Sequence, residues 1–162
     1  MASTPVTGNV MLEPLGGGLT REETFNGQAV ETVNARLNIL GPFREDNPAA
    51  SQAATALQLG AIDGTAPTGL PAPAAGTIVG IISHSNAALT AGTATAQATV
   101  NGTASGDTSV LSTTNPTKKV TMLTTPVAFV QGDLLGIKLA TSSGYLPVTA
   151  DHDHYLMVRW GA

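Results

Sequence analysis

Residues 93–111 read TATAQATVNGTASGDTSVL and predict a β-hairpin. Alanine alternates with threonine and glutamine along 93–98, which is the period of a strand that buries one face. Asn101-Gly102 follows, and this pair strongly favours a type I′ turn between two strands. Residues 103–111 then provide the returning strand. This segment alone therefore indicates an antiparallel sheet.

Further short strands are predicted on both sides of the hairpin, with turn residues between them. They cover residues 77–83, 119–124, 134–141 and 155–160. No part of residues 76–162 shows a sustained helical period, and regularly spaced short strands are typical of a sandwich or barrel. The fold class is therefore predicted to be all-β, with a β-sandwich body over residues 76–162.

Two segments of different composition precede this body. Residues 47–75 are rich in Pro, Ala and Gly, so we expect a linker that lies along a surface. Residues 1–46 hold half of the charged residues and are expected to form an extended N-terminal arm. Strand-like alternation recurs in residues 33–40 and 55–62, which would complete the body.

One part of the arm predicts a helix. Thr20-Arg21-Glu22-Glu23 has the spacing of a capping box, with Thr first and Glu three residues later. Asn26-Gly27 follows within two turns, so this helix is expected to be short.

The composition favours an oligomeric protein and excludes several classes. Of the 162 residues, 24 are alanine and only 11% are charged, so the core is thin and the surface is poor in charge. Association with neighbours often supplements such a core. The net charge of −4 comes without a basic stripe, so no nucleic-acid partner is expected. No apolar run reaches the ~18 residues of a membrane helix, and the N-terminus does not have the pattern of a secretory signal.

The cluster Asp151-His152-Asp153-His154 invites a chemical interpretation. On a strand, His152 and His154 share one face, and two such imidazoles can bind one divalent metal. Nothing in the sequence places a third ligand beside them, and His84 is the remaining histidine. A polar start of the last strand is the alternative, which we favour because motifs this short recur by chance.

No enzymatic site is expected. The chain has no Gly-x-Ser-x-Gly elbow, and no Lys follows Gly16-Gly17-Gly18 as a phosphate-binding loop requires. We therefore predict no catalytic residues and no cofactor.

The apolar side chains of the arm are the candidates for partner binding. An aromatic or aliphatic side chain on an arm needs a surface to cover it, either on a neighbour or on the body of its own chain. Addition of a strand to a neighbouring sheet is expected through Val33–Ile39 or Val6–Leu12. The predicted partner-binding residues are Phe25, Val33, Leu37, Ile39 and Phe43.

About half of the chain resembles small phage structural proteins with jelly-roll bodies. The residues that carry the resemblance are Ala75–Ile81, Thr99–Thr103, Phe129–Ile137 and Asp151–Trp160. Gly132-Asp133 followed by alternating aliphatic residues is also similar to the tumour-necrosis-factor and C1q class of trimeric jelly rolls. The resemblance implies a trimeric jelly-roll body.

The function that the resemblance implies is decoration of a bacteriophage head. Such cement proteins bind the capsid surface as homotrimers and brace the major capsid protein, which would place this chain in the virion after synthesis in the host cytoplasm. Two alternatives stay open. One is a tail or head fibre component or a receptor-binding protein with the same body. The other is a small carbohydrate- or metal-binding β-sandwich module.

Overall fold

The computed structural model describes residues 12–15, 19–22, 37–60 and 68–161. The chain divides into two units, residues 1–36 and 37–162. In the first unit, β1 (Leu12–Leu15) and β2 (Leu19–Glu22) pair antiparallel, with Leu12 opposite Glu22. Thr20 therefore lies in a strand, and the helix predicted from the capping box is wrong. Strand pairing satisfies backbone groups of this segment, whereas a short helix is costly to nucleate.

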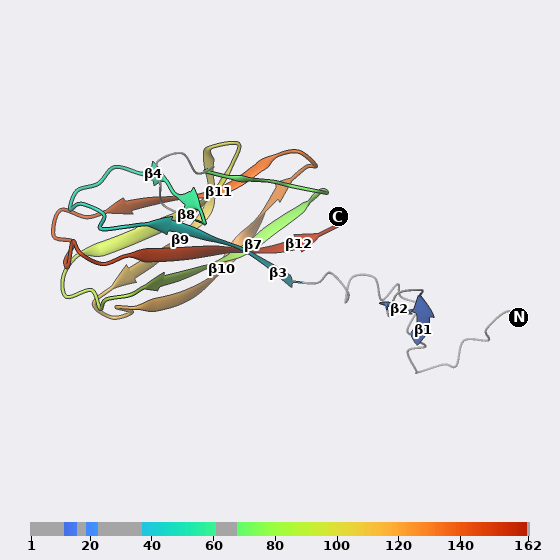
Figure 1. The fold of residues 1–162 in the computed structure, drawn as a ribbon, viewed down its shortest axis with the longest axis horizontal. Helices are drawn as coiled ribbons and strands as arrows, with labels where there is room; N and C mark the ends of the chain where they lie inside the picture. The colour runs from blue at the N-terminus through green and yellow to red at the C-terminus, as the bar shows by residue number, and fades with distance from the viewer. Residues whose placement is uncertain (1–11, 16–18, 23–36, 61–67, 162) are drawn as a thin grey trace, which may run out of the picture. The chain divides into compact units, whose positions relative to one another are not determined.

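The second unit is built from strands throughout its described part, as Figure 1 shows. The all-β fold class predicted from the sequence is confirmed. The strands are β3 (Leu37–Glu45), β4 (Thr55–Ala56), β5 (Gln58–Leu59), β6 (Leu70–Pro71), β7 (Gly76–Ser85), β8 (Thr93–Val100), β9 (Thr103–Ser112), β10 (Lys118–Phe129), β11 (Leu134–Thr141) and β12 (His152–Trp160).

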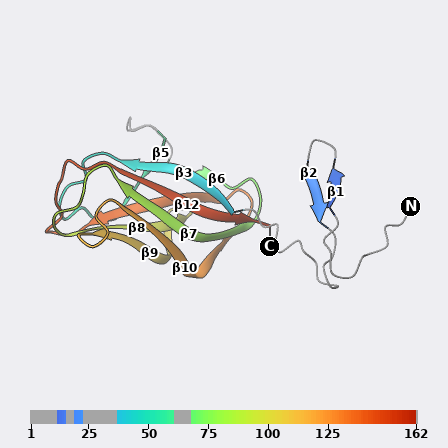
Figure 2. The same ribbon diagram turned by 90° about the horizontal axis from the view of Figure 1, so that it is seen from below.

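These strands form two antiparallel sheets that pack face to face (Figures 1 and 2). One has the order β10-β7-β12-β3-β5, and the other has the order β4-β11-β8-β9, with β6 also paired to β11. The pairing is nested, because β3 pairs with β12, β4 with β11, β7 with β10, and β8 with β9. A long hairpin rolled up in this way is a jelly roll, so the predicted sandwich has jelly-roll connectivity.

The sandwich begins within the segment predicted as the arm. Strand-like alternation over residues 33–40 and 55–62 predicts strands that complete the body, and β3, β4 and β5 overlap these ranges. Beyond that prediction, β3 continues to Glu45 between β12 and β5, and the segment predicted as a linker also supplies β6. The chain crosses from one sheet to the other at Leu57, whose side chain is fully buried and whose amide donates to the Ile137 carbonyl. Burial of the Leu57 side chain stabilises the position of this segment in the sandwich.

The β8–β9 hairpin has the predicted geometry. Asn101 and Gly102 have φ values of 51° and 75°, the left-handed conformation that a type I′ turn requires at both positions. Along β8 the three alanines are fully buried, and the residues between them are only partly buried. Small side chains here leave room for larger ones from the facing sheet.

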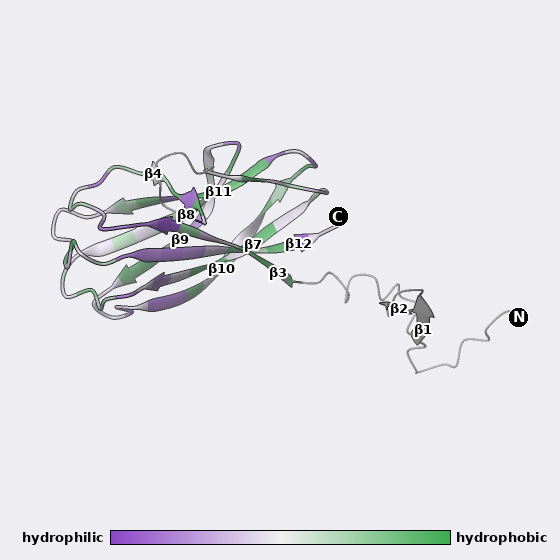
Figure 3. Ribbon diagram, in the orientation of Figure 1, coloured by the Kyte–Doolittle hydropathy of each residue, from purple (hydrophilic) through white to green (hydrophobic). Residues whose placement is uncertain are grey.

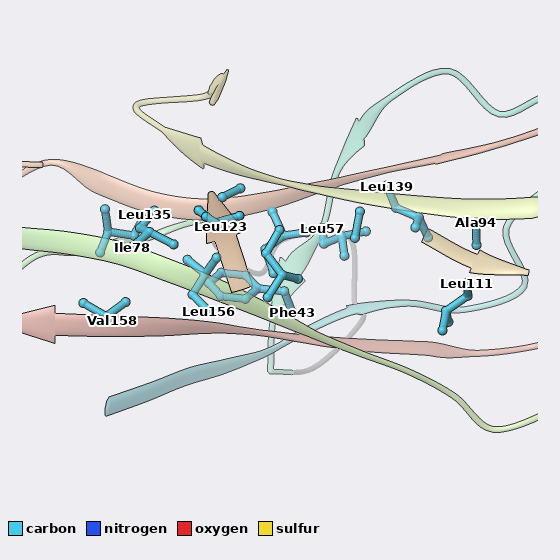
Figure 4. Close-up of a cluster of buried hydrophobic side chains, with 14 of the residues drawn as sticks. Phe43, Leu57, Ile78, Ala94, Leu111, Leu123, Leu135, Leu139, Leu156 and Val158 are labelled. Atoms are coloured by element: carbon cyan, nitrogen blue, oxygen red, sulfur yellow. The ribbon is translucent and has the colours of Figure 1, made fainter. Parts of the chain in front are cut away.

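The core fills the space between the two sheets (Figure 4). Phe43, Ile81 and Leu156 enter the core from the β10-β7-β12-β3-β5 sheet. Leu139 enters it from the facing sheet. At one end, the rings of Phe129 and Trp160 meet edge to face, with their centroids 5.4 Å apart. Phe129 is buried in the core, and Trp160 packs against it while staying partly exposed.

No helix long and apolar enough to cross a membrane occurs in the part of the chain that the structure describes.

Candidate functional site

The two histidines of β12 point into the sandwich. His152 and His154 are both fully buried, while Asp153 between them faces outward and forms an ion pair with Arg44, with Nε and Oδ1 2.6 Å apart. The expectation that both imidazoles share one strand face is confirmed. The apolar positions Leu156 and Val158 continue the same inward face.

His154 belongs to a hydrogen-bonded chain that joins the two sheets. Its Nδ1 lies 3.0 Å from the Ser83 hydroxyl on β7. Ser83 donates across the core to the Ser109 hydroxyl on β9, at 2.9 Å. Thr121 on β10 donates to the same Ser109 oxygen at 3.1 Å. Because Ser83 gives its proton to Ser109, its oxygen is left to accept Nδ1–H of His154.

His152 has a separate partner. Its Nε2 lies 2.7 Å from the hydroxyl of Tyr145, which is fully buried. The rings of His152 and His154 are nearly parallel, with an interplanar angle of 7° and centroids 5.7 Å apart. Nδ1 of His152 and Nε2 of His154 have no hydrogen-bond partner within the described residues.

Burial sets the charge state of this cluster. It lowers the pKa of His152 to about 4 and that of His154 to about 3, and the neighbouring His152 lowers the latter further. Burial also raises the pKa of Tyr145 to about 12. All three groups are therefore neutral at pH 7, which suits an interior where an unpaired charge is costly.

The histidine pair does not build a metal site with the residues around it. His84, the third histidine, lies on β7 opposite Asp153, so it is on the outer face of the sheet and is exposed. No group of three or more His, Cys, Asp or Glu side chains within the described residues is placed to hold a metal ion. What the cluster does is to bridge two sheets with neutral hydrogen bonds.

The sequence analysis did not identify Tyr145, Ser83 and Ser109 as members of this cluster. A weak signal exists for Ser83, because it follows Ile81 by two residues and so shares the inward face of β7. Nothing in the sequence brings Tyr145 to His152, since that contact depends on how the loop between β11 and β12 folds.

The outer face of the β10-β7-β12-β3-β5 sheet carries a second candidate site. Across four adjacent strands, Met122, Gly80, Met157 and Ile39 lie side by side in register. Met122 and Ile39 are 55% and 58% exposed. A Cβ atom on Gly80 would lie 2.9 Å from Sδ of Met157 and 3.3 Å from Sδ of Met122, so the glycine leaves room for both methionine side chains.

Neighbouring rows extend this apolar surface. Val120, Ile82 and Tyr155 form the next row, and Val120 is 61% exposed. On the other side, Leu37 lies opposite Arg159 and is 48% exposed. We name this surface the outer apolar face; its residues are Leu37, Ile39, Ile82, Val120, Met122, Tyr155 and Met157.

The outer face of the opposite sheet is different in character. Its corresponding central row consists of Lys138, Gln97 and Thr108. Figure 3 shows that hydrophobic and hydrophilic residues alternate along the strands. One side of the sandwich thus presents polar side chains to solvent, and the other presents methionine and β-branched aliphatic residues. Contiguous apolar surface on a soluble domain is typical of an interaction site.

A charged row borders the outer apolar face. Lys118, His84, Asp153 and Arg44 lie in register across β10, β7, β12 and β3. The carboxylate of Asp153 forms an ion pair with Arg44. The hydrogen bond between them raises the pKa of Arg44. An apolar centre with a charged rim is the usual anatomy of a protein–protein interface.

The predicted partner-binding residues fall into three groups. Leu37 and Ile39 belong to the outer apolar face. Phe43 is fully buried in the core of its own chain, so its assignment as an anchor in a neighbour is wrong. The reason is that β3 lies inside the sheet, where Phe43 pairs with His154 and faces inward. Phe25 and Val33 lie outside the described residues, as do residues 6–11 of the segment proposed for strand addition.

Comparison of the chain with models of known protein families, with curated proteins and with solved structures finds no match.

Proposed function

We propose that this chain is a non-enzymatic structural protein of a bacteriophage virion. It binds the outer surface of the head as a homotrimer and stabilises the shell by bridging copies of the major capsid protein. The observation that carries the proposal is the outer apolar face, in which Ile39, Val120 and Met122 are each more than half exposed. Such a surface is stabilised when a partner covers it.

The sheet presents the outer apolar face as a preformed surface. Because the backbone holds adjacent strands in register, the positions of these side chains relative to one another are set before a partner binds. Met122, which lies beside Gly80 and is 55% exposed, adds a polarisable side chain that adapts to an uneven partner. The homotrimer is taken from the resemblance to trimeric jelly rolls. Three linked copies convert weak individual contacts into firm attachment through a high effective concentration.

The test is co-sedimentation with heads of the encoding phage that were assembled without this protein. We expect the purified protein to sediment with the heads, to saturate, and to raise the temperature at which they open. Absence of binding to heads, with binding to tails or fibres instead, would replace the proposal by the fibre alternative. Binding to neither particle would overturn the proposal as a whole.

A further inference from the structure

A hollow of about 540 Å³ opens beside the outer apolar face. Strands β7 and β10 and the segment before β10 form it, and its residues are Ile82, Ser83, His84, Asn115, Lys118, Lys119 and Val120. Ile82 and Val120 also belong to the outer apolar face. The hollow and the face are therefore one continuous surface, apolar over most of its area and basic at this end.

The lysines of the hollow lack a carboxylate partner. Within the described residues, the ion pair between Arg44 and Asp153 is the only one, and it uses the acidic residue of the same charged row. Lys118 lies directly opposite His84, and Lys119 lies opposite Ser83. The exposed amide of Asn115 adds a further hydrogen-bond donor at the wall. Lys118 and His84 thus share the outer face of the sheet at this end, Lys119 follows along the edge strand, and no residue of the hollow is acidic.

We propose that this hollow binds a carboxylate side chain of the protein that covers the outer apolar face. The inference rests on the proposed function, because it assigns the chemistry of the partner at that same face: apolar residues with an aspartate or glutamate at one end. Charge complementarity favours such a partner over a second copy of this face, which would bring lysine against lysine. The partner excludes water from the hollow as it docks, which strengthens the attraction between ammonium and carboxylate.

A peptide titration tests the inference without a capsid. The probe is acetyl-leucyl-glutamyl-leucine amide, and its glutamine analogue is the control for the negative charge. We expect the glutamate peptide to shift the backbone amide NMR signals of Ile82, His84 and Val120, and to bind about threefold more tightly than the analogue. Equal binding of both peptides, or no shift at these signals, would overturn the inference.

Charge-reversal variants connect the hollow to assembly. The double variant Lys118→Glu/Lys119→Glu should lose the peptide response and bind heads about tenfold more weakly. Lys138→Glu, on the opposite sheet, is the matched control and should behave as wild type. Lys118→Arg/Lys119→Arg should retain binding because the charge is kept. If the reversed variant is folded and binds heads as well as wild type, the inference fails while the proposed function stands. If wild type itself does not bind heads, the proposed function fails, and the peptide titration still decides the inference.

Discussion

The buried histidines of β12 make the stability of the sandwich dependent on pH. In the unfolded chain a histidine has a pKa near 6.5, whereas in the fold burial lowers it to about 4 for His152 and about 3 for His154. Below pH 6.5 the unfolded state therefore binds more protons than the folded state. Stability is fully present above pH 6.5 and is lost as the pH falls towards the folded pKa values.

We predict that the free energy of unfolding falls between pH 7 and pH 5 by about 2 kcal/mol for each of these two histidines. Urea unfolding at the two pH values measures it. The nearby groups that bear charge are Asp151, Asp153 and His84, and the first two partly favour protonation of His152. Burial raises the pKa of Glu45, so protonation of Glu45 favours the folded state and offsets part of the loss of stability near pH 5.

Substitution of a buried histidine tests this prediction. His154→Gln should reduce the loss of stability between pH 7 and pH 5 by about half. A wild-type protein that is equally stable at both pH values would contradict the structure, since the buried imidazoles would then have to carry their charge at no cost.

Ser83 holds the polar bridge between the sheets at its centre. Ser83→Ala removes the hydroxyl that contacts both His154 and Ser109, and both of those groups stay buried. We expect a loss of about 1–3 kcal/mol in the free energy of unfolding, because unsatisfied buried polar groups are costly. Ser143→Ala is the control at an exposed loop position and should be neutral. Equal stability of the two variants would show that the bridge contributes nothing.

Among the elements, the β8–β9 hairpin depends on a turn in which Gly102 has a left-handed conformation. Gly102 has a φ of 75°, and a Cβ placed on it would meet no atom within 4 Å. Gly102→Ala should therefore lower the free energy of unfolding by about 1 kcal/mol through backbone strain alone. Gly144 is equally open but has no such φ, so Gly144→Ala is the matched control. Thermal unfolding of both variants measures the difference, and equal melting temperatures would contradict a type I′ turn.

The long strands could be predicted from the sequence, and the short ones could not. Residues 93–100 and 134–141 alternate strictly enough that β8 and β11 have the predicted bounds. In contrast, alternation over residues 55–62 predicts a strand but not its division at Leu57 into β4 and β5, which pair with β11 and β3 in different sheets. Local pattern carries no information on that division, since the partner strands lie far along the chain.

The same limit explains the error at β3. The concentration of charged residues in 1–46 predicts an arm, and strand-like alternation over 33–40 indicates only the first part of β3. The fold places residues 37–45 between two strands and buries Phe43. For the candidate sites, the shared face of His152 and His154 follows from the period of a strand. Their hydrogen bonds to Tyr145 and Ser83 depend on tertiary structure, and so does the register that gathers the outer apolar face from four strands.

For the whole molecule, we predict a homotrimer in solution. Light scattering of the purified protein should give a mass near three times the 16.3 kDa of one chain. A thin core and a surface poor in charge favour association, and the resemblance to trimeric jelly rolls sets the number of copies. A folded protein with the mass of one chain would contradict the prediction that the trimer forms before assembly.

The central claim is that the outer apolar face attaches the protein to its partner. The most direct test compares wild type with the double variant Ile39→Thr/Met122→Gln in co-sedimentation with heads that lack the protein. Ile39→Thr keeps a β-branched side chain and Met122→Gln keeps side-chain length, while both remove apolar surface. Thr108→Gln, on the exposed edge strand of the opposite sheet, serves as the control. We predict that wild type and the control sediment with the heads and that the double variant stays in solution. Equal sedimentation of all three folded proteins would contradict the claim.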